Sequence, residues 1–188
     1  QASEGPEKPK AAQGGPRPPA RRGPQAKRSG GAAMAAGRWL SSAQRARTLP
    51  AAFWRDYGMR VEEAGGPRAL CKDPHARALV EALLPAEERR ALEADPTAGV
   101  RSAVAGCRAA FMDRFVLDAV GKRIRQAAVL GSGMDTRAYR LDLPPQMRIV
   151  EVDEAAVHEA KAAALHDQST RCSVRRAAVD LPGGAVGA

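Results

Sequence analysis

The sequence predicts an α/β protein with a parallel sheet in its second half. Residues 126–131 form a short apolar run that ends in glycine, and residues 147–153 and 173–180 form two further strand-like runs. An alanine-rich helical pattern over 154–166 connects the second run to the third. Strand, loop, strand, helix and strand at this spacing are typical of a parallel sheet, so we expect a Rossmann-like core.

The segment that precedes the sheet has the signals of several helices. Asp73 followed by Pro74 is a typical helix start, and apolar residues then recur at helical spacing. A short charged helix is expected over 87–93 and a longer one over 100–123. The apolar residues expected to line the longer helix are Val104, Phe111, Phe115, Val116, Leu117 and Val120.

The net charge of +9 lies entirely in the first 55 of the 188 residues. Residues 1–33 hold seven basic and two acidic side chains, and residues 34–55 add four basic side chains and no acidic one. Residues 56–188 are therefore formally neutral. The excess charge belongs to an arm and not to one face of a domain, which argues against a nucleic-acid-binding domain.

The N-terminal composition also bears on order and location. Residues 1–33 have almost no large apolar side chains, so we expect them to be disordered. The stretch that begins at Met34 contains Arg, Ala and Ser without acids, which is typical of an organelle transit peptide; a solvated linker is the alternative. Cytoplasmic and organellar locations both fit, and Met34 is a candidate first residue.

The chain is predicted to have three regions and no membrane span. They are a disordered basic arm over 1–55, a helical prelude over 56–125 and a partial Rossmann-like half over 126–188. No apolar run reaches the roughly 18 residues that a membrane span needs. The three cysteines are far apart and form no C-x-x-C motif, so we expect no metal site and no disulfide.

A glycine loop followed by an acidic residue indicates a nucleoside-binding site. Gly131 and Gly133 directly follow the first strand, at the edge where open parallel sheets bind ligands. Asp153 ends the next strand, where its carboxylate can accept hydrogen bonds from both ribose hydroxyls. A dinucleotide fingerprint requires a small residue where this chain has Thr136, whereas an adenosyl methyl donor has no phosphate to bind. The alternative is that the glycines only form a tight turn after the strand, and that the acid is solvated and binds no ligand.

At these residues the chain resembles a known family. Q-A-A-V-L-G-S-G-M-D-T-R-A-Y-R-L (126–141), followed by I-V-E-V-D (149–153) and Lys161, is similar to the leucine carboxyl methyltransferases. Upstream, K-D-P-H-A-R-A-L (72–79) and R-A-A-F-M-D (108–113) resemble the helices that precede that family's core. The resemblance implies a class I methyltransferase core, S-adenosyl-L-methionine as cofactor, and methylation of a carboxylate or hydroxyl on a small molecule or protein.

The resemblance also implies roles for individual residues. The two loop glycines would pack against the methionine part of the donor, and Asp153 would hold its ribose hydroxyls. Arg108 would pair with the donor carboxylate, with Arg114 as the alternative, and Asp180 and Leu181 would lie beside the adenine. The donor-binding residues implied are Arg108, Gly131, Gly133, Asp153, Asp180 and Leu181.

Methyl transfer needs little further machinery, because positioning for in-line displacement carries most of the rate. No residue is therefore assigned a catalytic role. Asp135 and Arg137 are expected to brace the loop.

The family continues beyond A-V-D-L (178–181) with further strands and an E-G-x-x-x-Y type motif, whereas this chain stops at Ala188. We therefore expect a core truncated after its third strand, whose methyltransferase activity is doubtful. In the order 3-2-1 its first strand would be an open apolar edge. The alternatives are a non-catalytic product that acts through partner binding and a protein that binds nucleic acid through its basic arm.

Overall fold

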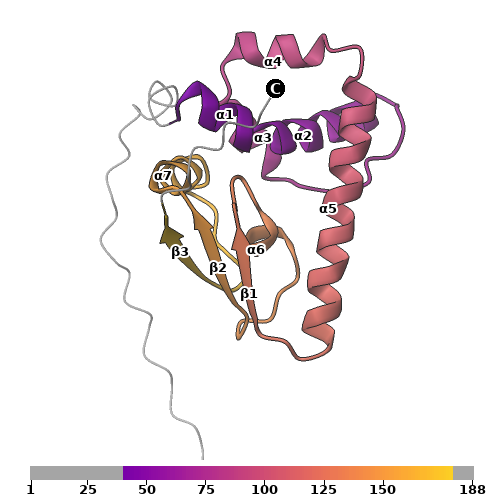
Figure 1. The fold of residues 1–188 in the computed structure, drawn as a ribbon. Helices are drawn as coiled ribbons and strands as arrows, with labels where there is room; N and C mark the ends of the chain where they lie inside the picture. Colours follow the sequence, from indigo (N-terminus) through magenta and orange to yellow (C-terminus); the bar gives the residue numbers. More distant parts are fainter. Residues whose placement is uncertain (1–39, 180–188) are drawn as a thin grey trace, which may run out of the picture. The chain divides into compact units, whose positions relative to one another are not determined.

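The computed structural model describes residues 40–179 (Figure 1). The helices that precede the sheet are α1 (Ser42–Thr48), α2 (Pro50–Glu63), α3 (Ala76–Leu83), α4 (Ala86–Glu93) and α5 (Ala98–Gly121). The elements that follow are β1 (Gln126–Leu130), α6 (Arg137–Arg140), β2 (Arg148–Asp153), α7 (Ala155–Ala164) and β3 (Ser173–Ala178).

The three strands form one parallel sheet in the order β1-β2-β3. Gln126 of β1 pairs with Arg148 of β2, which in turn pairs with Ser173 of β3. This arrangement confirms the predicted α/β class and the predicted strand order. Within residues 40–179, β1 pairs with β2 alone, so its other side is an edge.

One apolar core joins the helices to the sheet. Phe53 of α2 and Leu79 of α3 are fully buried in it, together with Val157 of α7. Met147, which directly precedes β2, and Ile149 of β2 belong to the same cluster. Because α7 contacts both α3 and β3, the helical prelude and the sheet share one core.

The N-terminal boundary differs from the sequence expectation. Residues 42–55, expected to belong to a disordered arm, form α1 and the start of α2. Ser41 caps α1 in a capping box with Gln44, in which each side chain bonds the other residue's backbone N–H. Leu49 is fully buried, as is Phe53 one turn later. The burial of these apolar side chains offsets the entropy cost of ordering the chain. Residues 1–39, including Met34, lie outside the described part.

The predicted start of α3 at Asp73 and Pro74 is wrong. The helix begins at Ala76, with His75 as its N-cap residue. The Asp73 side chain faces the interior instead and has no exposed surface. It accepts hydrogen bonds at 2.8 Å from Arg55 Nε of α2 and at 2.8 Å from Thr136 Oγ1, which precedes α6. Its other oxygen keeps a local contact and accepts a hydrogen bond from His75 N at 3.2 Å, so the carboxylate joins the segment before α3 to α2 and to the residue before α6.

The apolar stripe of α5 is divided between core and surface. Val116 and Val120 pack against the core. The outward flank of α5 carries large apolar side chains, and Leu130 at the end of β1 is also exposed. These side chains are between 62% and 77% exposed, and they are Val100, Val104, Phe111, Phe115 and Leu130.

Among residues 40–179 no helix is both long enough and apolar enough to cross a membrane. The same part of the chain contains no group of three His, Cys, Asp or Glu side chains that could hold a metal ion. The three cysteines are free thiols.

We expect Asp73→Ala to lower the free energy of unfolding by about 3–5 kcal/mol, because it leaves the Arg55 guanidinium buried without its partner. Arg55 is only 11% exposed and its bond to Asp73 is 2.8 Å long. Asp118→Ala removes an exposed acid that pairs with Arg114 at 3.8 Å, and should change stability by less than about 0.5 kcal/mol. Urea denaturation measures both, and equal effects would contradict the assigned role of Asp73.

We expect the 188-residue chain to self-associate at micromolar concentration, because a contiguous apolar flank of this kind favours protein contacts. The double change Phe111→Gln and Phe115→Gln should shift sedimentation velocity profiles toward the monomer. Arg90→Gln, at an exposed position of α4, should leave association unchanged. A wild-type chain that sediments as a monomer at all concentrations would show that this flank does not mediate self-association.

Candidate functional site

The glycine loop leaves β1 at the carboxyl edge of the sheet. Gly131 has φ 61° and Gly133 has φ 45°, which are left-handed conformations that favour glycine. A Cβ added at Gly131 would meet no atom within 4 Å, so there is open space beside the backbone there. The loop can therefore accept a ligand against its main chain.

Asp153 lies directly against this loop, as the sequence predicts for the acid at the end of the second strand. Its carboxylate is almost fully buried and accepts hydrogen bonds from Gly133 N at 2.7 Å and from Glu154 N at 2.8 Å. A carboxylate offers about four lone-pair sites, so two remain for further donors. The loop and the acid thus form one unit in which Asp153 fixes the conformation of Gly133.

Helix α1 lies over this unit, an arrangement that sequence analysis did not predict. Arg47 Nη2 is 3.6 Å from Asp153 Oδ1 and 2.9 Å from Glu154 Oε1. Gln44 donates a hydrogen bond to Glu154, and Thr48 approaches within 3.7 Å of the position of a Cβ at Gly133. Residues more than 80 positions apart meet here, so no local pattern could have indicated the contact.

The contacts of Glu154 make the docking of α1 dependent on pH. The hydrogen bond from Gln44, together with Arg47, lowers the pKa of Glu154 below its ordinary value. The contribution of these contacts is present above the ordinary glutamate pKa and is lost as the pH falls through the lowered value.

Three backbone N–H groups of the loop have partners inside the chain. Ser132 N donates to Val152 O at 3.1 Å, Gly133 N donates to Asp153, and Asp135 N donates to Ser132 O at 2.9 Å. A phosphate-binding loop needs such groups free, and it does not place a buried carboxylate beside them. The geometry is therefore unsuited to a pyrophosphate and suited to a ligand that presents hydroxyl donors.

Ser132 is a further polar group of the loop that sequence analysis did not single out. Its Oγ is buried and has no hydrogen-bond partner among the described residues. Unpartnered buried hydroxyls are uncommon, and they often mark a site that a ligand or water completes. The open space at Gly131 and this hydroxyl both fit a bound organic molecule.

The residues after the loop form a brace. Arg137 pairs with Asp135 and donates to Asp113 Oδ1 of α5 at 3.0 Å. Arg140 Nη1 donates to Asp113 Oδ2 at 2.6 Å. Side chains from α6 and α5 thus fix the far end of the loop, which is the arrangement that a bracing role for Asp135 and Arg137 requires.

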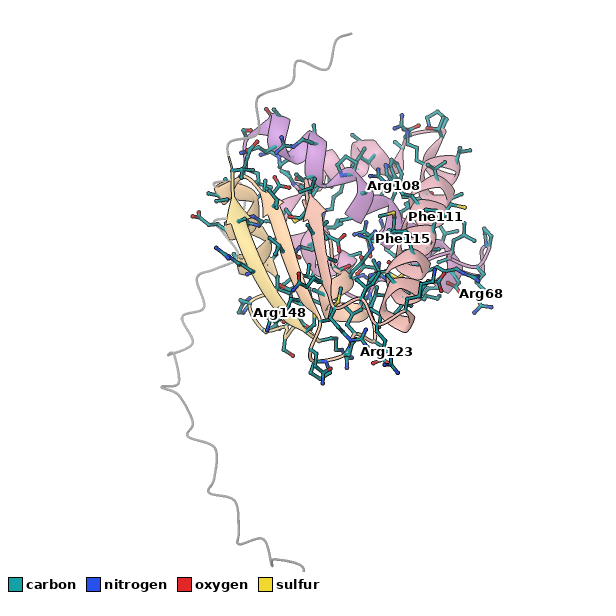
Figure 2. The ribbon with its side chains drawn as sticks, turned by 60° about the horizontal axis from the view of Figure 1, so that its bottom comes forward. Arg68, Arg108, Phe111, Phe115, Arg123 and Arg148 are labelled. Atoms are coloured by element: carbon teal, nitrogen blue, oxygen red, sulfur yellow. The ribbon has the colours of Figure 1, made fainter. Side chains whose placement is uncertain are left out.

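Arg108 lies apart from the glycine loop's own contacts. It is exposed on α5 and shares one flank of that helix with Phe111 and Phe115 (Figure 2). Among residues 40–179 it forms no ion pair, whereas its alternative, Arg114, pairs with Asp118. Asp180 and Leu181 lie outside the described residues. The structure thus brings Gly131, Gly133 and Asp153 together and leaves the other three donor-binding assignments untested.

Comparison with known proteins supports the same interpretation. Residues 52–186 match the model of the leucine carboxyl methyltransferase family. A protein of Mycolicibacterium gilvum that carries the name of an S-adenosyl-L-methionine-dependent methyltransferase is 40% identical over 133 residues, which is 65% of this chain and 44% of that protein.

A protein of the same designation from Rhodococcus jostii is 40% identical over 129 residues, covering 65% of this chain and 43% of the relative. The chain therefore spans less than half the length of these relatives. Because the family model matches residues 52–186, which are well over half of the sequence, this chain belongs to the leucine carboxyl methyltransferase family.

Proposed function

We propose that this chain carries the S-adenosyl-L-methionine-binding half of a methyltransferase. The observation that supports this most directly is that the N–H groups of Ser132, Gly133 and Asp135 are paired within the chain, beside the Asp153 carboxylate with its free lone pairs. Such a site disfavours an anionic pyrophosphate and favours ribose hydroxyls. The family of the chain uses a donor of this chemistry.

Each implied residue has a stated task in this proposal. Asp153 accepts hydrogen bonds from the ribose hydroxyls, and Gly131 and Gly133 leave room for the methionine part. Arg108, without an acid partner among the described residues, is available for the carboxylate of the donor. Asp180 and Leu181, which follow β3, would flank the adenine.

S-adenosyl-L-methionine supplies, when bound, a methyl group already activated by its sulfonium. The task of the chain is to bind and orient this group, because a carboxylate or an alkoxide-forming hydroxyl acceptor attacks in line. We propose O-methylation of such an acceptor as the reaction. The relatives are more than twice as long as the matched segment, and we assign the acceptor to no residue of this chain.

A second candidate function is partner binding without catalysis. It is favoured by the apolar flank of α5 and the edge of β1, which lie side by side where Phe115 and Leu130 line one cavity of about 220 Å³. A chain that binds no donor at all, but whose association depends on Phe111 and Phe115, would support this function over the first.

We expect the chain to bind S-adenosyl-L-homocysteine or S-adenosyl-L-methionine in calorimetry and not to bind NAD. Asp153→Asn should weaken binding by about 1.5–3 kcal/mol, the usual size for a lost hydrogen bond to a charged group. Asp142→Asn, an exposed acid outside the loop, is the matched control and should have no effect. Saturable NAD binding without a response to either adenosyl ligand would exclude the proposed function.

We expect Arg47→Ala to increase donor affinity by several fold, because the change frees Asp153 and loosens α1 over the loop. Arg45→Ala is the control on the same helix, since Arg45 pairs with Glu88 at 2.9 Å and not with the site. Stopped-flow binding of S-adenosyl-L-homocysteine measures both variants. Weaker binding in the Arg47 variant alone would assign Arg47 to the donor site and reject its role as a competitor.

A further inference from the structure

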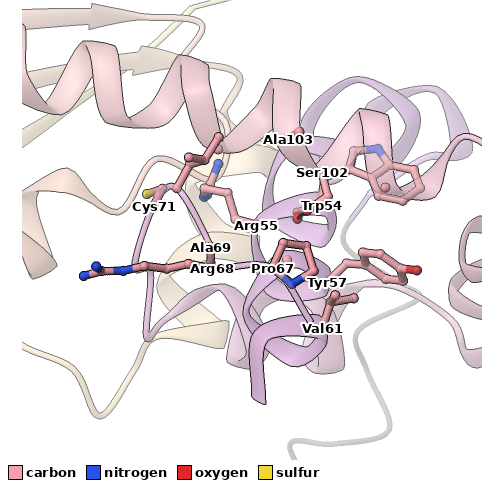
Figure 3. Close-up of a pocket in the computed structure, with 14 residues that line it drawn as sticks. Trp54, Arg55, Tyr57, Val61, Pro67, Arg68, Ala69, Cys71, Ser102 and Ala103 are labelled. Atoms are coloured by element: carbon pink, nitrogen blue, oxygen red, sulfur yellow. Dashed lines mark hydrogen bonds between the residues drawn. The ribbon is translucent and has the colours of Figure 1, made fainter. Parts of the chain in front are cut away.

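A cavity of about 490 Å³ lies between α2, α5 and the connection from α2 to α3. Its volume falls within the range of about 300–1,000 Å³ that small-molecule sites occupy. None of the proposed donor-binding residues lines it. Its lining includes Trp54, Tyr57, Val61, Leu70, Ser102 and Ala103 (Figure 3).

The charged groups of the wall are already neutralised or point elsewhere. Arg55 donates to Asp73 at 2.8 Å and to Met134 O at 3.2 Å, so its charge is paired. The Arg68 guanidinium extends away from Trp54 and Tyr57 (Figure 3). A charged ligand would therefore lose its hydration without gaining a partner inside the cavity.

Among the uncharged polar groups of the wall, the Ser102 hydroxyl is already paired. Ser102 Oγ donates to Trp54 O at 3.0 Å. Burial raises the pKa of the Cys71 thiol, which keeps it neutral at physiological pH. What remains is a mostly apolar surface with the indole of Trp54 as its largest element, against which an apolar molecule can bury its own apolar surface.

Glycines allow α2 and α5 to approach each other closely at some positions, and the cavity lies between these positions. A Cβ at Gly58 would lie 2.6 Å from Ser102 Oγ, and one at Gly106 would lie 3.1 Å from Leu70 Cβ. At these positions α2, α5 and the connecting segment touch directly. A Cβ at Gly99, which also lines the cavity, would meet nothing within 4 Å. The hollow is thus bounded by tight contacts, so it does not result from loose packing throughout.

We propose that this cavity is a binding site for a small, uncharged, apolar molecule with an aromatic or branched aliphatic body. The site is independent of the donor site and of the proposed function. The chemistry of the occupant follows from the lining. Burial of apolar surface against apolar walls is favourable, and Arg55, which is paired with Asp73, is not available to bind an anion.

The test uses the uncharged fluorescent probe N-phenyl-1-naphthylamine with the full 188-residue chain. We expect saturable binding of one probe per chain, with enhanced probe emission. Gly99→Leu fills the cavity from α5 and should weaken the Kd by about tenfold or more, because it removes the space for the probe. Gly121→Leu is the matched control: it lies on the same helix, its Cβ also meets nothing within 4 Å, and it is outside the cavity.

Two further variants keep the test decisive. Ala103→Leu fills the same cavity from another position and replaces Gly99→Leu if thermal denaturation shows that the latter fails to fold. Phe111→Gln with Phe115→Gln changes the exposed flank of α5 and should leave probe binding unchanged. The proposal is overturned if the probe does not saturate, if both filling variants bind as wild type does, or if the flank variant alone abolishes binding. Asp153→Asn should bind the probe normally, which separates this result from the donor site.

Discussion

The buried Asp73 carboxylate connects the helical prelude to the glycine loop, and the placement of the site depends on it. One oxygen of this group accepts hydrogen bonds from Arg55 of α2 and from Thr136, and Arg140 approaches the same oxygen at 4.0 Å. Arg55 in turn reaches Met134 O within the loop. A buried acid is tolerated only with such partners, so its presence fixes the relative position of the segments that supply them.

The geometry of the glycine loop likewise depends on polar groups whose hydrogen-bond partners lie within the chain. Asp153 accepts a hydrogen bond from Gly133 N. The hydrogen bonds of Arg137 and Arg140 to Asp113 fix the residues that follow the loop. A loop fixed in this way needs no ligand to define its conformation. It presents a preorganised surface, and preorganisation reduces the entropy cost of binding.

Sequence reasoning identified the features that depend on local pattern. The strands at 126–130 and 148–153, the glycine loop and its acid all have short-range signals of period, turn residue and spacing. It missed the distant partners of Asp73: one carboxylate oxygen bonds His75 N locally, but the other accepts from Arg55 and Thr136, and the helix begins only at Ala76. It also assigned residues 42–55 to a disordered arm, because the basic composition of this stretch was given more weight than the apolar residues Leu49 and Phe53, which are buried.

The parts of the site that sequence could not indicate are those built by distant segments. The position of α1 over Asp153 depends on Arg47 and Glu154, which are separated by 107 positions. The cavity beside Trp54 depends on where glycines let two helices approach. Both features emerge only when the core has brought these segments together.

The docking of α1 gives the loop an unusual dependence on ionic strength. Arg47 is 43% exposed and its partner Glu154 is 22% exposed, so dissolved ions weaken this pair, but only in part, because its 2.9 Å separation is well inside the Debye length of about 8 Å at physiological salt. Added salt therefore shifts the population toward chains whose Asp153 is uncovered. The apparent affinity of any ligand that needs this carboxylate is proportional to that uncovered fraction. Added electrolyte, which weakens most charged contacts, would therefore strengthen the binding of such a ligand.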